Sequence, residues 1–191
     1  MKKALTLLLA LGLTMSLAAC GGADDSAGTG TTDSGTSATT PPEVKLVSKE
    51  ANFTTMLVPS DFGEFRDQDG YAIAEGVGCN IVVTPTVGNP SDSPATLTQE
   101  YFTSQLESSY SNIKVLAYDN AATVAGVDAV CFQFTGDGKT NGTNKTVCLI
   151  AMFFTLEGQA CEQQVTFTYD TGANTALEAS LKEIIDSISL E

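Results

Sequence analysis

Hydrophobic and polar positions alternate along several stretches of the chain, a pattern typical of half-buried β-strands. "DAVCFQFTG" (128–136) and "CEQQVTFTYD" (161–170) show this period of two, and "IKVLAY" (113–118) is strand-like. "GYAIAEG" (70–76) and "NIVVTPTV" (80–87) predict a hairpin pair, and Asp69-Gly70 before them predicts a tight turn. "TVCLIAMFFTLEG" (146–158) is apolar on both faces, so we expect it to be the central strand of a sheet.

Two segments show the helical period instead. In residues 96–110 one side collects large apolar residues, and Thr96 with Gln99 forms a possible capping box. In residues 175–188 the apolar positions recur at helical spacing, with Thr175 and Glu178 as a second capping box. The apolar positions are Leu97, Tyr101, Phe102, Leu106 and Tyr110 in the first segment, and Leu177, Leu181, Ile184, Ile185 and Ile188 in the second.

Strands in sequence, one inserted helix and one terminal helix predict an α+β fold. We expect an antiparallel sheet of about six to seven strands, flanked by two main helices. Residues 43–191 are numerous enough for one domain with a sizeable core.

The N-terminal residues form a different pattern. Residues 1–19 have a positive start at Lys2 and Lys3 followed by an uncharged apolar run, which predicts a signal peptide. Leu17-Ala18-Ala19-Cys20 resembles the lipobox of bacterial lipoproteins. The resemblance implies that the chain is cut before Cys20 and that the Cys20 thiol carries a diacylglyceryl group. Two or more acyl chains give stable membrane attachment. The alternative is ordinary signal cleavage with a free Cys20.

Residues 20–42 contain the cysteine and then no apolar side chain larger than alanine, so this segment cannot offset the entropy of ordering. We expect a flexible Gly/Ser/Thr-rich tether that ends at Pro41-Pro42.

Charge and histidine content exclude several classes of function. The chain has 9 lysine plus arginine against 23 aspartate plus glutamate and no basic cluster, so nucleic-acid binding has no electrostatic basis. It has no histidine, which removes Ser-His-Asp and Cys-His catalysis and most zinc hydrolase sites. We expect no catalytic set, no cofactor site and no metal site.

Four cysteines lie in the domain: Cys79, Cys131, Cys148 and Cys161. An even count in an exported domain suggests disulfides. If "GDGKTNGTNK" (136–145) joins adjacent strands, Cys131 comes close to Cys148, which leaves Cys79 with Cys161. Free buried thiols are the main alternative, because all four lie in strand-like runs. A cysteine-only zinc site is disfavoured, since no CxxC pair exists.

The order of elements resembles the PsbP-like family and its bacterial lipoprotein relatives. "FTTMLVPSDFGEF" (53–65), "TVAGVDAVCFQFTG" (123–136), "TFTYD" (166–170) and the terminal "LKEIIDSISLE" (181–191) carry the resemblance. It implies an antiparallel sheet flanked by helices and a binding or assembly factor rather than an enzyme.

The leading hypothesis is therefore a lipid-anchored protein on the extracytoplasmic face of the cell membrane, acting as a noncatalytic binding or assembly module. Its expected partners are the membrane, through the acylated N-terminus, and an envelope protein. The alternatives are a histidine-free, carboxylate-based hydrolase of cell-wall glycan and a solute-capture lipoprotein. A deep cleft with two carboxylates would favour the hydrolase, and a shallow exposed patch the binding module.

Overall fold

A computed structural model describes residues 44–173 and 175–191. The predicted signal peptide, Cys20 and the tether to residue 42 lie outside the described residues. The elements, in chain order, are β1 (Leu46–Ala51), β2 (Thr54–Pro59), β3 (Arg66–Gln68), β4 (Tyr71–Gly76), β5 (Cys79–Val83), β6 (Val87–Gly88), α1 (Gln99–Leu106), β7 (Tyr110–Val124), β8 (Val127–Gly138), β9 (Asn144–Leu156), β10 (Gln159–Asp170), α2 (Ala176–Asp186) and β11 (Ser189–Leu190).

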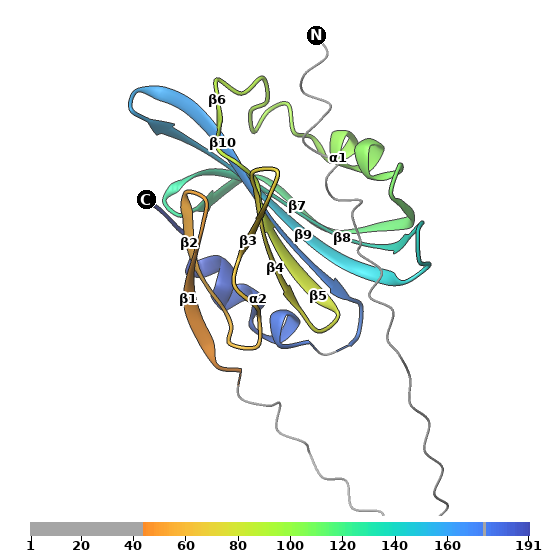
Figure 1. The fold of residues 1–191 in the computed structure, drawn as a ribbon. Helices are drawn as coiled ribbons and strands as arrows, with labels where there is room; N and C mark the ends of the chain where they lie inside the picture. The colour runs from red at the N-terminus through yellow and green to blue at the C-terminus, as the bar shows by residue number, and fades with distance from the viewer. Residues whose placement is uncertain (1–43, 174) are drawn as a thin grey trace, which may run out of the picture.

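The main sheet has eight antiparallel strands in the order β3-β4-β5-β10-β9-β8-β7, with β6 paired to β10. A smaller sheet, in the order β1-β2-β11, packs with α2 against one face of the main sheet, and α1 lies on the other side (Figure 1). The α+β class and the two flanking helices are confirmed. The large antiparallel sheet is confirmed as well; its eight strands are one more than the expected six to seven, because the two-residue strand β6 is too short to show an apolar periodicity. The smaller sheet of β1, β2 and β11 was not expected.

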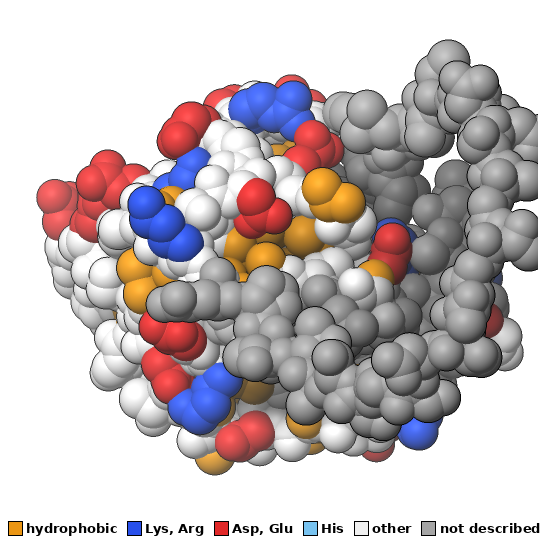
Figure 2. Space-filling view, turned by 90° about the horizontal axis from the view of Figure 1, so that it is seen from below, with side chains coloured by type: hydrophobic (Ala, Val, Ile, Leu, Met, Phe, Trp, Pro, Cys, Tyr) orange, Lys and Arg blue, Asp and Glu red, His pale blue; other side chains and the backbone are white. Residues whose placement is uncertain are grey.

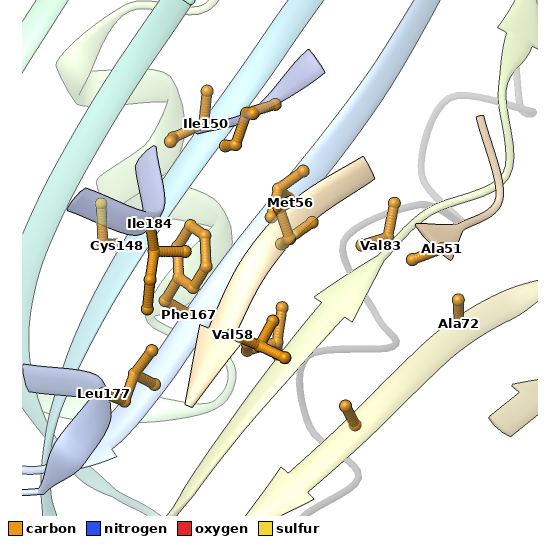
Figure 3. Packing of buried hydrophobic residues seen from close by; sticks show 14 of the residues in the cluster. Ala51, Met56, Val58, Ala72, Val83, Cys148, Ile150, Phe167, Leu177 and Ile184 are labelled. Atoms are coloured by element: carbon orange, nitrogen blue, oxygen red, sulfur yellow. The ribbon is translucent and has the colours of Figure 1, made fainter. Parts of the chain in front are cut away.

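Each face of the main sheet buries its own hydrophobic cluster. Under α2 and β2, the buried side chains of Ile184, Met56 and Val58 pack toward Phe167 on β10 (Figure 3). Under α1, the ring of Phe102 stacks on Phe132 with centroids 4.9 Å apart. The sheet is thus covered on both faces, and each helix is held by an apolar side.

Strand β10, not β9, lies in the middle of the sheet, which corrects the expectation for residues 146–158. Because β10 is central, even its polar side chains are buried: Glu162, Gln163, Gln164, Thr166 and Thr168. A period-two pattern of polar residues predicts a solvent-facing side, but here both sides of the strand face packed neighbours.

Local signals at the turns and helix ends were partly right. Asp69 and Gly70 both have positive φ and join β3 to β4, as the expected hairpin turn requires. Thr175 caps α2 as expected, since its Oγ1 accepts from the backbone N–H of Glu178 at 3.1 Å. The cap of α1 is Thr98 rather than Thr96.

Helix α1 also ends earlier than its apolar spacing suggested. Tyr110 begins β7, and its ring meets Phe134 edge to face at 5.2 Å. None of the helices within the described residues is both long and apolar enough to cross a membrane.

Candidate functional site

An open depression of about 630 Å³ runs beside β1 and is the candidate binding site. We call it the β1 groove; it is lined by Val47, Ser48, Lys49 and Glu50 of β1 and by Ser60, Phe62 and Glu64 of the segment that follows β2. It is open and mostly polar, unlike the enclosed apolar pockets that take small cofactors. Its rim presents the exposed side chains of Ser48, Glu50, Ser60 and Glu64.

Lys49 crosses the β1 groove and ties its two walls together. Its ammonium group donates to the carbonyl oxygens of Phe62 at 3.3 Å and Gly63 at 3.0 Å, and to Glu64 Oε1 at 2.7 Å. The Lys49 side chain is only 10% exposed, whereas that of Glu64 is 88% exposed. The largely covered ammonium group of Lys49 thus has three oxygen acceptors, and the exposed carboxylate of Glu64 remains on the rim.

The floor of the groove is fixed by Phe62. This ring is 4% exposed and lies against Gly76 at the end of β4. A Cβ built on Gly76 would lie 2.7 Å from Phe62 Cε2, so only glycine leaves room for the ring. The loop after β2 is thus held close to the main sheet.

The other wall, the β1–β2 hairpin, is fixed by its turn. Asn52, with positive φ, donates from Nδ2 to the carbonyl oxygens of Gly70, Val83 and Thr84 at 3.0–3.1 Å. Thr54 Oγ1 donates to Gln163 Oε1, and Gln163 Nε2 donates to Thr84 O. These bonds hold the hairpin on β5 and β10, so the groove is preorganised.

The described cysteines are free thiols and do not form the expected pairs. The polar loop does join neighbouring strands, and Cys131 and Cys148 share a sheet face. However, Cys131 lies opposite Ile150, and Cys148 lies opposite Gln133. Such diagonal neighbours have Cα atoms about 7–8 Å apart, beyond the roughly 7 Å that a disulfide spans. The register, offset by two residues, is the physical reason.

The second expected pair is separated along β10. Cys79 lies opposite Tyr169, and Cys161 is eight residues earlier on the same strand. At about 3.3 Å per residue the two are roughly 26 Å apart, so this pairing is wrong. The alternative, free thiols packed as small apolar groups, describes these residues.

Burial holds three of these thiols, those of Cys79, Cys131 and Cys148, in the protonated form by raising their pKa. Burial raises the pKa of Cys148 to about 12, with Cys131 as a second cause. Burial, followed by Asp61 and Asp170, raises the pKa of Cys79 to about 11. The reactive species is the thiolate, which is scarce at neutral pH when the pKa is this high.

Glu162 of β10 and Asp92, which lies between β6 and α1, form an acidic pair on the α1 side of the main sheet. Glu162 is 3% exposed, and its Oε1 accepts from Gln164 Nε2 at 2.7 Å. Burial is the largest cause of the raised pKa of Glu162, and Asp92 raises it further. Burial also raises the pKa of Asp92, and these two carboxylates both raise the pKa of Tyr101 after its own burial. Within the described residues, no three histidine, cysteine, aspartate or glutamate side chains are placed to hold a metal ion.

Sequence reasoning missed the groove residues. Lys49 stands between exposed Ser48 and Glu50 in a polar stretch, where a lysine predicts a solvated position. Its burial depends on carbonyl oxygens 13 and 14 residues away. No local signal could have found that contact.

Comparisons with known proteins give the fold class. No protein-family model matches the chain, and no curated protein matches it. Among solved structures, LpqN, described as involved in cell envelope biogenesis of Mycobacterium tuberculosis, is similar with a TM-score of 0.52 at 12% identity, over 78% of this chain and 91% of LpqN.

The Ran-binding protein Mog1p of Saccharomyces cerevisiae gives a TM-score of 0.50 at 13% identity, over 76% of this chain and 96% of Mog1p. A mutant of Mog1 gives 0.51 at 11% identity, over the same shares. The chain therefore has the Mog1/PsbP-like fold. At these identities the likeness shows the fold alone.

Proposed function

We propose that this chain is a lipid-anchored protein of the extracytoplasmic membrane face, and that its domain is a noncatalytic binding or assembly module. The observation that carries the binding role is the β1 groove, an open polar depression with a preorganised wall on each side. The lipobox at Cys20 supports the anchor. The likeness to LpqN, which is described as involved in cell envelope biogenesis, supports the location, and the Ran-binding protein Mog1p shares the fold.

The surface chemistry also fits a protein partner. On the face seen from below in Figure 2, acidic and basic side chains are interspersed around hydrophobic ones. Hydrophobic side chains surrounded by polar and charged ones resemble the apolar core and polar rim of a protein interface. The hydrolase alternative draws less support, because Glu162 of the acidic pair is buried and a catalytic carboxylate must reach its substrate.

Site-specific photo-crosslinking in intact producing cells tests this proposal. A photoreactive residue replaces Ser60, which is exposed and lines the groove, in the full chain. The matched control replaces Thr123, an exposed residue of edge strand β7. We expect a discrete protein adduct from position 60 and none from position 123. Adducts of equal yield from both positions, or none from position 60, would overturn the binding role of the groove.

A further inference from the structure

The outer edge of β1 carries unpaired backbone groups. Ser60 N–H donates to Lys45 O at 2.8 Å, and these two residues continue the β1–β2 register. Because antiparallel partners alternate between hydrogen-bonded and non-hydrogen-bonded pairs, Val47 and Lys49 also direct their backbone groups toward β2. The groups that point away from β2 are those of Leu46, Ser48 and Glu50.

No strand within the described residues pairs with that edge, since β1 is terminal in the order β1-β2-β11. The β1 groove contains Ser48 and Glu50 in its wall, so the outward N–H and C=O groups border an open depression. An inward-pointing lysine normally protects an edge strand from pairing. Here Lys49 is bound by two carbonyl oxygens and Glu64, so its charge does not oppose a partner.

The charges at the groove select the kind of partner. Glu50 is exposed, and within the described residues its carboxylate forms no hydrogen bond or ion pair. Glu64 is exposed as well and lies on the rim of the groove. Lys49 is the groove's cation and is nearly buried. Among the lining residues the exposed charges are therefore the carboxylates of Glu50 and Glu64, which complement lysine or arginine side chains; Lys45, exposed just before β1, lies outside the lining.

From the unpaired edge of β1, the open groove and the exposed carboxylates of Glu50 and Glu64, we propose that the β1 groove binds an extended protein segment. This segment adds as a strand to the outer edge of β1 and carries basic residues at alternate positions. This inference rests on the proposed binding function and names its mode. Backbone hydrogen bonds to Ser48 and Glu50 provide affinity, and alternate side chains beside Glu50 provide specificity. An alternating pattern is required because successive side chains of a strand face opposite sides.

The test uses the full chain and a labelled, capped hexapeptide of alternating lysine and valine, with binding measured by fluorescence anisotropy. Ser48→Pro removes the outward N–H without touching the β1–β2 pairing, because proline is tolerated on an edge strand where its nitrogen faces outward. We expect it to weaken binding at least tenfold. Ser48→Ala, which keeps the N–H, is the matched control and should bind like the wild type.

Charge is tested on the same probe. We expect Glu50→Gln to weaken binding about two- to fivefold, as for one cross-strand charge pair, and a hexapeptide of alternating glutamate and valine to bind at least tenfold more weakly than the lysine form. Amide hydrogen exchange should slow at Ser48 and Glu50 when the lysine peptide is added, and at neither residue in Ser48→Pro.

Equal binding by wild type and Ser48→Pro, with no added protection at Ser48, would overturn strand addition. Equal binding of the two peptides would overturn the basic partner class. Self-association that Ser48→Pro abolishes would show a second copy of the chain as the occupant and overturn the proposal. Each of these results leaves the crosslinking test at position 60 to decide the binding function separately.

Discussion

The hydroxyl of Thr54 on β2 donates a 2.5 Å hydrogen bond to Oε1 of Gln163 on β10, and both residues have no exposed surface. They are 109 positions apart in the chain. The bond joins the smaller sheet to the middle strand of the main sheet. It therefore sets the position of the β1–β2 hairpin and with it the β1 groove.

Thr54→Val should destabilise the domain by about 1–3 kcal/mol, because Gln163 Oε1 is then buried without a donor. Urea unfolding measures the change. In Thr54→Val with Gln163→Leu, most of the loss should be recovered, since both polar partners are gone and Thr84 O still accepts from Asn52. Additive losses in the double variant would contradict a direct coupling between the two residues.

Ile184→Ala should cost about 2–5 kcal/mol, the usual range for truncating a buried isoleucine. Ile184 is fully buried and points from α2 toward Cys148 and Phe167 (Figure 3). The neighbouring Ile185→Ala, at a half-buried position, is the control and should cost less. Equal losses would mean that α2 is rotated relative to the structure.

Cys148 should make the domain less stable in alkaline solution. Its thiol is neutral when protonated, and its pKa rises from 9.0 to about 12 in the folded state. The folded state thus holds this proton more tightly, so the free energy of unfolding falls as pH rises from about 9 to 12. The slope from this group is about 1.4 kcal/mol per pH unit. Urea unfolding at several pH values, compared with Cys148→Ala, isolates the effect; identical slopes would refute it.

Cys20→Ser should abolish lipid attachment. Metabolic labelling with a fatty-acid analogue should mark the wild type and leave the variant unlabelled, because only the thiol accepts the diacylglyceryl group. Cys161→Ser, which changes a buried domain thiol, is the control and should label normally. Label on Cys20→Ser equal to that on the wild type would exclude the anchor.

The elements that were predicted correctly are those whose contacts are local. The β4–β5 hairpin follows from two apolar runs around a short turn, and α2 follows from its apolar spacing and the Thr175 cap. Strand β10 was found, but its central position was not. Gln163 is buried because Thr54 and Thr84 O satisfy it, and neither contact leaves a trace in the sequence around it.

The candidate site was less predictable than the fold. The pair Cys131–Cys148 was wrong because the presence of two strands does not fix their register, and a shift of two residues separates these cysteines. The pair Cys79–Cys161 was wrong because Cys79 lies opposite Tyr169, eight residues along β10 from Cys161. The groove depends on the contact of Lys49 with residues 62–64, and no periodic pattern in the sequence indicates that contact. Fold class follows from patterns repeated along the chain, whereas a site follows from single long-range contacts.

The strand order has a consequence for how the domain is made. Strands β7, β8, β9 and β10 pair with their immediate neighbours in the chain, so this meander closes only short loops. By contrast, Cys79 of β5 pairs with Tyr169 of β10, and Thr54 of β2 pairs with Leu190 of β11, so both pairings join residues far apart in the sequence. A ribosome delivers the N-terminal strands first. Strand β2 therefore gains its partner β11 only after Leu190 has been synthesised, and until then the β1–β2 hairpin lacks the third strand of the smaller sheet.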